Sequence, residues 1–316
     1  MTEVAFREGR ASDLRAAFDL GERAWNESRR TRRLLGHDAG ERDAAELDAQ
    51  WARERSFLEF LAAQEDGAFW LCERDDELIG YARAARFGSM DELTELWVVP
   101  PEAGRGLGHA LLERIWPDSP TPELGRVVLT FGTPGDLTLY TGFGVMPVGG
   151  HWHMRHRVEQ YLEQRAAEVD AAEPGVHLLT PERAVEEWKR LEPAAIGHER
   201  PLLHEFFGRT RICLACIDQD SGLAAGLCWV SSDGDIGPAV GETSAAVVPV
   251  VLAALDRVAK AQEPETFGVF CTTESWWLLD RLRRLGFRVH WPSWVMSSVP
   301  LPGLDRYVPT QPARLL

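Results

Sequence analysis

The feature that most constrains the fold of this chain is an internal repeat. Landmarks of the first half recur in the second half at separations of 146, 143 and 142 residues. The matching landmarks are Gly80 with Gly226, 112–115 with 255–258, and Gly144 with Gly286. A near-constant offset favours a tandem duplication, and 316 residues are enough for two domains of ordinary size.

Hydrophobic periodicity predicts a similar order of elements in both halves. In the first half we expect helices over 11–28 and 41–63, a β-hairpin over 69–82, strands over 93–99 and 126–131, a short helix over 137–141 and a last strand over 145–148. In the second half we expect helices over 181–191, 200–207, 245–260 and 276–284, and strands over 212–217, 224–230 and 267–271, with the segment 236–238 following the hairpin. The predicted class is α+β. Two domains, 1–157 and 176–316, would each form a mixed, largely antiparallel sheet flanked by helices, joined by a helical linker over 158–175.

The charge of the chain limits its partners. With 34 Lys and Arg against 49 Asp and Glu, the net charge is −15. Such a chain should repel a phosphate backbone, so we expect no nucleic-acid partner, and it should attract cationic ligands. No apolar run approaches the ~18 residues of a membrane span, and the N-terminus lacks the features of a signal peptide. We therefore expect a cytoplasmic protein without a membrane partner.

The cysteines and histidines do not predict a disulfide framework or a metal site. Five cysteines are an odd number in a long chain. Cys213 and Cys216 form a CxxC pattern, but they lie in an apolar strand, where residues three apart face opposite sides. His151 and His153 would share a strand face, yet no carboxylate or cysteine follows at a ligand spacing. We expect solvated histidines on a strand and no metal.

A glycine-rich loop between a strand and a helix carries the clearest chemical signal. The apolar strand ends at two prolines, Pro100 and Pro101, and the glycines Gly104, Gly106 and Gly108 then open a helix. Glycines let backbone amides approach a ligand, and the helix start adds positive potential, so the loop predicts a phosphate cradle. A Rossmann fingerprint is disfavoured, because the loop follows an antiparallel hairpin and no acidic residue ends a second strand ~20 residues on.

The strand and loop resemble the acetyl-CoA motif of the GNAT N-acetyltransferase superfamily. That motif reads Gln/Arg-x-x-Gly-x-Gly/Ala after a strand of the type Leu-aromatic-Val-x-Pro. Gly106 and Gly108 fit it, whereas Ala103 stands where the family has Gln or Arg. The resemblance implies acetyl-CoA as co-substrate, with no metal. The expected acetyl-CoA contacts are Trp97, Val98, Val99, Gly104, Arg105, Gly106, Leu107, Gly108 and His109.

A second motif agrees with the first copy only. The family often carries Leu-Tyr-x-x-x-Gly-Phe, and this chain has Leu139, Tyr140 and Gly144 at those positions. In the second copy Leu282 stands at the tyrosine position and Glu242 lies in the counterpart of the glycine loop. We therefore expect the second copy to bind no CoA. A tandem pair with one degenerate copy resembles the arrangement of mycothiol synthase within this superfamily.

The resemblance implies direct attack of an amine on the thioester, which requires a base, an oxyanion donor and an acid. Glu92 is the preferred base and Glu95 the alternative; on a regular strand the two face opposite sides. The backbone amide of Val98 or Val99 is the expected oxyanion donor. Tyr140 is the candidate acid for the leaving thiolate.

The expected function is therefore N-acetyl transfer to a primary amine of a small molecule or peptide, which the acidic charge suggests is cationic. The alternative is an acyl-CoA-binding or regulatory module without turnover, to which Ala103 and Glu102 lend weight. The expected oligomeric state is a monomer or a homodimer.

Overall fold

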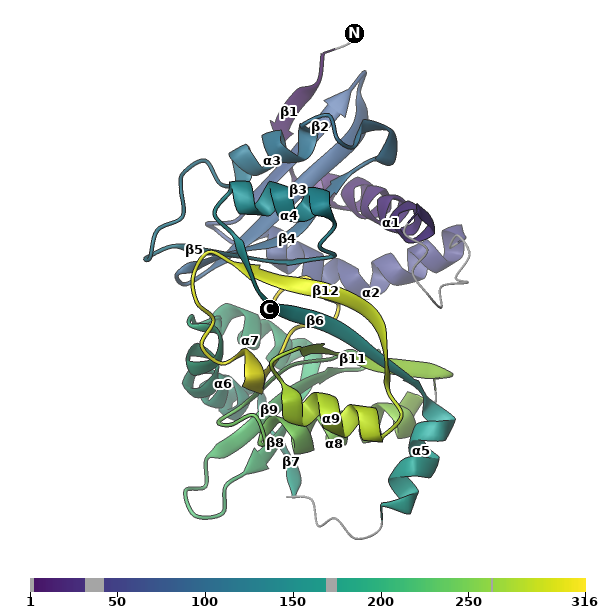
Figure 1. Ribbon diagram of the computed structural model, residues 1–316, viewed down its shortest axis with the longest axis vertical. Coiled ribbons are helices and arrows are strands. Elements are labelled where there is room, and N and C mark those ends of the chain that lie inside the picture. The colour runs from purple at the N-terminus through teal and green to yellow at the C-terminus, as the bar shows by residue number, and fades with distance from the viewer. Residues whose placement is uncertain (1–2, 32–42, 169–174, 263) are drawn as a thin grey trace. The chain divides into compact units, whose positions relative to one another are not determined.

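The chain forms two compact units. The computed structural model describes residues 3–31, 43–168, 175–262 and 264–316 (Figure 1). Unit 1 comprises residues 1–128 and 132–146, and unit 2 comprises 129–131 and 147–316. Residues 41–42 of the second predicted helix and 169–174 of the predicted linker lie outside the described residues. The elements are mixed α and β and the sheets largely antiparallel, which confirms the predicted fold class.

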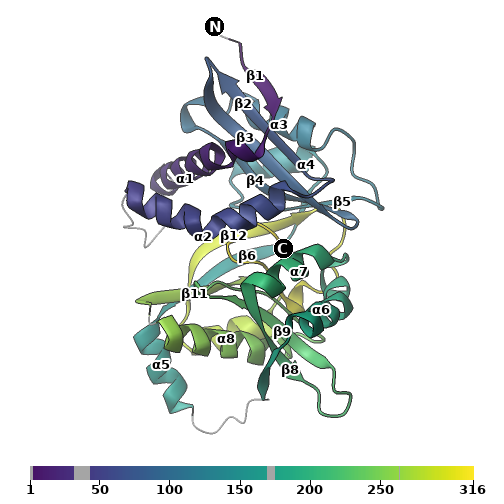
Figure 2. The same cartoon turned by 180° about the vertical axis from the view of Figure 1, so that it is seen from behind.

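Unit 1 has helices on both faces of a sheet. Its strands run in the order β1 (Ala5–Glu8), β2 (Ala68–Arg74), β3 (Glu77–Phe87), β4 (Met90–Val98) and β5 (Gly125–Thr130). The neighbours are antiparallel except β4 and β5, which are parallel. Helices α1 (Leu14–Thr31), after the short η1 (Ala11–Asp13), and α2 (Ala44–Ala62) cover one face. Helices α3 (Leu107–Ile115) and α4 (Pro134–Gly142) cover the other (Figures 1 and 2).

Local chemistry explains the ends of several elements in unit 1. Asp75 and Asp76 form the β2–β3 turn with φ of 52° and 62°, a left-handed conformation that aspartate tolerates better than most residues. Asp43 caps α2, and Thr133 caps α4, each in a reciprocal capping box. Pro134 then occupies the first turn of α4, where a missing amide hydrogen is harmless.

Unit 2 contains a five-stranded sheet and a second group of three strands. The five strands follow the order β13 (Tyr307–Val308), β10 (Ile236–Gly241), β9 (Ala224–Ser231), β8 (Arg211–Ile217) and β7 (Val176–Leu179). The other three are β12 (Arg288–Ser297), β6 (Met146–Arg157) and β11 (Thr266–Thr272). The helices are α5 (Val158–Ala167), α6 (Pro181–Ile196), α7 (Pro201–Thr210), α8 (Val247–Gln262) and α9 (Trp276–Arg284), with η3 (Leu304–Arg306). The core gathers around α8, which packs on β8, β9 and β10.

Strand β6 differs most from the sequence prediction. We expected a short strand over 145–148 that closes the first domain, but β6 extends to Arg157 and pairs with β11 from residue 151 onward. By its contacts the chain passes to unit 2 at residue 147, whereas the prediction ended the first domain at 157. The division into two copies and a linker stays a prediction. In the described part of the chain, no helix is long and apolar enough to span a bilayer.

Candidate active site

Strand β4 carries one extra residue opposite β3. Ala84 pairs with Leu93, but the preceding residue of β3, Arg83, pairs with Glu95. Thr94 is therefore an inserted residue, which makes a β-bulge in the strand that leads to the glycine loop. Bulges bend a strand and redirect its side chains.

The bulge brings the two candidate bases to one face of the sheet. Glu92 pairs with Ala85 and Glu95 pairs with Arg83. Ala85 and Arg83 are two residues apart on β3, so they share a face, and paired residues lie on the same face. The prediction that Glu92 and Glu95 face opposite sides is wrong, because simple alternation does not hold across an inserted residue. Glu92 is only 1% exposed and Glu95 7% exposed.

Glu95 is engaged on both carboxylate oxygens. Its Oε2 accepts a hydrogen bond from Arg83 Nη2, and its Oε1 accepts one from the Tyr81 hydroxyl at 3.1 Å. Arg83 and Tyr81 are both fully buried or nearly so. Both oxygens of Glu95 are thus already held in charge-assisted or phenolic hydrogen bonds, which favours a structural role for this carboxylate.

The two candidate oxyanion amides point in opposite directions. The Val99 amide donates to the Ile79 carbonyl at 2.9 Å, so it is directed toward β3. Successive amides alternate along a strand, and the Val98 amide is therefore directed away from β3. On that side the pairing of β4 with β5 ends at Leu93 and Val128 among the described residues. The Val98 amide is thus directed to the side of β4 where the pairing with β5 has ended. The Val99 amide, in contrast, is already hydrogen-bonded to the Ile79 carbonyl.

The glycine loop presents unoccupied backbone amides at the start of α3, after the turn η2 (Pro100–Glu102). Gly104 and Gly106 have φ of 76° and 83°, and no described atom lies within 4 Å of where their Cβ atoms would be. The first helical bond here runs from the Ala110 amide to the Gly106 carbonyl. Among the described residues no acceptor faces the amides of 104–109. The loop therefore fits an anionic ligand such as a pyrophosphate.

The acidic residue of the loop is neutralised by two arginines. Glu102 forms ion pairs with Arg74 at 2.5 Å and with Arg105 at 3.4 Å. The hydrogen bond from Arg74, aided by the charge of Arg105, holds the pKa of Glu102 below its usual range. Arg105 is 63% exposed, so its guanidinium is accessible at the edge of the cradle. Glu102 therefore presents no uncompensated negative charge to the loop.

The predicted acetyl-CoA contacts lie on different sides of the sheet. An added Cβ at Gly21 of α1 would lie 3.3 Å from the Trp97 ring, so Trp97 faces α1. Leu96 faces α3, because a Cβ at Gly108 would lie 4.0 Å from its side chain. Leu107 is buried under the loop, and His109 is exposed beside Phe143, with 5.0 Å between the ring centroids. Only the backbone of Trp97 is on the cradle side.

Tyr140 lies in the helix that packs behind the glycine loop. It belongs to α4 and is 6% exposed. The neighbouring Leu139 approaches the start of α3, since a Cβ at Gly108 would lie 3.4 Å from its side chain. The phenol is therefore a buried group of the helix that contacts the cradle helix.

Outside this site, His151 is more buried than predicted, and Cys213 and Cys216 lie in a strand as expected. His151 is 1% exposed rather than solvated, because β6 is covered by other parts of unit 2; its Nδ1 lies 2.9 Å from Ser293 Oγ. Burial lowers the pKa of His151 to about 3. Cys213 and Cys216 are buried free thiols in β8. Within the described residues, no group of three His, Cys, Asp or Glu side chains is placed to hold a metal ion.

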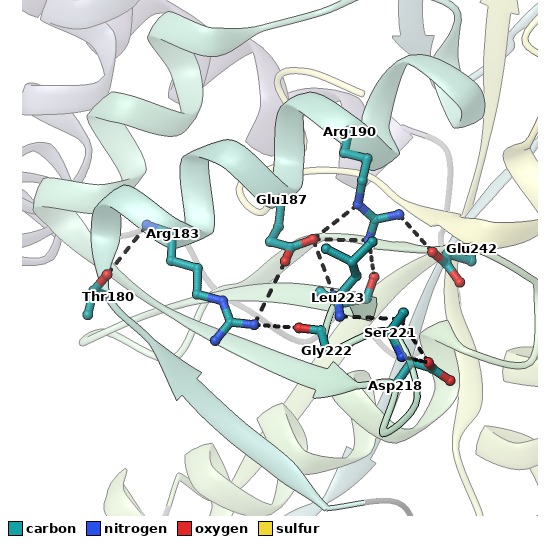
Figure 3. Close-up of polar contacts among 10 residues, drawn as sticks. Thr180, Arg183, Glu187, Arg190, Asp218, Ser221, Gly222, Leu223 and Glu242 are labelled. Atoms are coloured by element: carbon teal, nitrogen blue, oxygen red, sulfur yellow. Dashed lines mark hydrogen bonds and ion pairs between the residues drawn. The ribbon is translucent and has the colours of Figure 1, made fainter.

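In unit 2, the loop that corresponds to the glycine loop carries a carboxylate that is paired with an arginine of the same unit. Glu242 follows β10 and precedes α8, and its carboxylate lies 2.7 Å from Arg190 Nη1. Arg190 also binds the buried Glu187 at 3.0 Å, so one guanidinium bridges two carboxylates (Figure 3). The Glu242 carbonyl accepts from Arg306. An anionic ligand would meet a carboxylate here.

The first turn of α8 also offers fewer amides than that of α3. Pro249 has no amide hydrogen, and the amides of Ala246 and Val248 already donate to carbonyls within the loop. The unit 2 loop therefore lacks the open row of donors seen at 104–109.

The comparisons with known proteins agree with this geometry. Residues 31–130 match the model of the acetyltransferase (GNAT) family. This match covers the region of the glycine loop, and the whole chain has the fold of tandem GNAT proteins. A tandem GNAT protein from the clavulanic acid biosynthesis pathway is similar at a TM-score of 0.60 and 16% identity, covering 94% of this chain and 99% of that one.

Two further solved structures share the fold. A provisionally named acetyltransferase from Pyrococcus horikoshii has a TM-score of 0.66 at 14% identity, covering 96% of this chain and 92% of its own. A GCN5-related N-acetyltransferase from Sphaerobacter thermophilus has a TM-score of 0.51 at 17% identity, covering 94% and 96%. No curated protein sequence matches the chain. GNAT proteins use acyl-CoA, and their acceptors are generally amines.

Sequence reasoning missed the residues that hold the bulge. Arg83 and Thr94 were not singled out, although Arg83 is a charged residue within the apolar run 78–85 of its strand. A charge inside an apolar strand is the signal that could have found it, because such a charge is almost always paired when buried.

Proposed function

We propose that this protein is an N-acetyltransferase that transfers acetyl from acetyl-CoA to a primary amine by direct attack, at a site in unit 1. The observation that carries the proposal is the row of open amides at 104–109 at the start of α3. Those amides, with Arg105 beside them, would bind the pyrophosphate of acetyl-CoA.

The reaction needs three further groups. The Glu92 carboxylate would take a proton from the acceptor ammonium. The Val98 amide would donate to the carbonyl oxygen as it becomes an oxyanion. Tyr140 would protonate the departing thiolate of CoA, and it lies in the helix packed against the cradle helix.

The acceptor class follows from charge and chemistry. A net charge of −15 favours a cationic amine in a small molecule or a peptide. The candidate base lies on the face of the sheet covered by α1 and α2, opposite the face of α3. An acceptor that approaches from the α1 and α2 side would reach the thioester from the side opposite the cradle.

The test is release of CoA thiol, followed with a disulfide reagent, across a panel of polyamines, aminoglycosides, amino acids and peptides. We expect amine-dependent thiol release and an acetylated product by mass spectrometry. Tight binding of acetyl-CoA without thiol release for any amine would favour the acyl-CoA-binding module instead. Neutralisation of Glu102 by two arginines removes one of the reasons for that module.

A further inference from the structure

Four contacts hold the bulge of β4 in place. Thr94 Oγ1 donates to the Arg83 carbonyl at 3.1 Å, directly across the inserted residue. Arg83 Nη2 donates to Glu95 Oε2, and Arg83 Nη1 reaches the Leu58 carbonyl of α2 at 3.3 Å. The Tyr81 hydroxyl donates to Glu95 Oε1 at 3.1 Å. The bulge is thus tied to β3 by a hydroxyl and to α2 by a guanidinium.

These groups are buried, which makes them costly as simple stabilisers. Arg83 is 0% exposed, and Thr94 and Glu95 are each 7% exposed. A buried ion pair loses its hydration, and apolar side chains of similar volume often stabilise a fold as well or better. What the ion pair adds over apolar packing is a single preferred geometry, because a guanidinium and a carboxylate must meet at defined angles.

The geometry they fix is that of the reacting strand. The bulge lies between Leu93, the last residue of β4 paired with β5, and Val98, whose amide is directed toward the opened edge. It also turns the side chain of Glu92 to the face of Glu95. A regular strand would separate these two carboxylates onto opposite faces and change the direction of the amides that follow.

We propose that Thr94 and the Arg83–Glu95 pair are positioning residues, which hold the bulge so that the Val98 amide and the Glu92 carboxylate are both aimed at the reacting thioester and amine. This inference rests on the proposed function. It assigns Glu95 a role through Arg83 and the strand, and not as the base.

The decisive pair of variants is Thr94→Val and Thr94→Ser. Valine has the shape of threonine without the hydroxyl, and serine keeps the hydroxyl. We expect Thr94→Val to lower kcat about tenfold while the Kd for acetyl-CoA changes less than twofold, since the amides of 104–109 lie beyond the bulge. Thr94→Ser should keep kcat within about twofold of the original protein. A Thr94→Val protein with unchanged kcat would overturn the proposal.

Hydrogen exchange gives a readout that does not need turnover. Peptides covering 93–99 should exchange faster in Thr94→Val than in Thr94→Ser, and peptides covering 224–231 in unit 2 should be unchanged in both. If the original protein acetylates no amine, the proposed function fails and the catalytic part of this inference fails with it, whereas faster exchange at 93–99 would still show that the Thr94 hydroxyl holds the bulge. Equal exchange in the two variants contradicts it.

The ion pair is tested by replacing both partners together. Arg83→Met with Glu95→Leu leaves no uncompensated charge, so folding is expected to survive. We expect a fall in kcat with an unchanged Kd for acetyl-CoA and an unchanged pH profile of kcat/KM, because the base remains Glu92. Loss of the acidic limb of that profile would instead identify Glu95 as the base.

Discussion

Gly106 is one residue of the proposed phosphate cradle, the amides of 104–109, and its contribution to acetyl-CoA binding can be tested by itself. Its φ of 83° strains any residue with a Cβ, and the space that a side chain would enter is the open space in front of the amides. We expect Gly106→Val to weaken acetyl-CoA binding at least tenfold, about 1.4 kcal/mol, as measured by calorimetry.

The control for backbone strain is Gly222 in unit 2. It has φ of 71° and equally open surroundings, but it lies in the β8–β9 turn. Gly222→Val should lower the melting temperature by a similar amount and leave acetyl-CoA binding unchanged. Equal loss of binding in both variants would show that strain, and not the cradle, explains the effect.

The proposed role of Tyr140 as an acid depends on one atom, its hydroxyl oxygen. Removal of the hydroxyl in Tyr140→Phe keeps the ring that is buried in α4. If the hydroxyl protonates the thiolate, kcat should fall about tenfold or more, with little change in the Kd for acetyl-CoA. Steady-state kinetics together with a thermal melt check this. An unchanged kcat contradicts the role of acid.

At the scale of elements, the sequence predicted those whose pattern is local. Helix α9 was placed at its observed bounds, and the β2–β3 hairpin lies where the polar turn indicated. The β4 bulge could not be predicted, because it shows only in the register between β3 and β4. Strand β12 was missed for a similar reason. Pro292 interrupts its pattern, and its place in the sheet depends on residues far away in the chain.

The same difference between local and long-range signals applies to the candidate site. The glycine loop could be read from three alternate glycines and a preceding strand, since both signals are local. The relation of Glu92 to Glu95 could not, because alternation fails at an inserted residue whose presence is decided by Arg83 and Thr94. The directions of the Val98 and Val99 amides likewise depend on which carbonyls of β3 they meet.

Strand β6 gives a prediction about pH. The pKa of His151 is lowered to about 3 by burial, whereas an unfolded histidine titrates near 6.5. Between these values the unfolded chain binds more protons, so stability falls as the pH decreases through this window. From pH 7 to pH 5 the contribution of His151 should decrease by about 2 kcal/mol.

The variant that tests this is His151→Asn, whose amide can replace Nδ1 as the partner of Ser293. Urea unfolding at pH 7 and pH 5 should show a smaller loss of stability in His151→Asn than in the original protein. The exposed His177 is the matched control, and His177→Asn should lose as much as the original protein does. An equal loss in all three proteins would mean that His151 does not carry this pH dependence.

At the scale of the whole molecule, the two units differ in what they offer an anion. Unit 1 presents open amides and a loop whose Glu102 is paired with two arginines, although the chain carries a charge of −15. In unit 2 the corresponding segment holds Glu242 against Arg190, and Pro249 removes an amide from the first turn of α8. The Glu242 carboxylate already pairs with the Arg190 guanidinium, which could otherwise have bound a phosphate. We therefore predict a single cofactor site, in unit 1.

Titration of the full chain with acetyl-CoA tests this asymmetry. We expect one equivalent bound per chain, and we expect Gly106→Val to abolish the signal instead of halving it. Glu242→Gln removes the negative charge in unit 2, but the stoichiometry should stay at one, because Pro249 and the internally bonded amides still leave no cradle there. A second equivalent in the original protein, or residual binding in Gly106→Val that Glu242→Gln strengthens, would place a working site in unit 2. A single equivalent that survives Gly106→Val unchanged would move the site away from the glycine loop altogether.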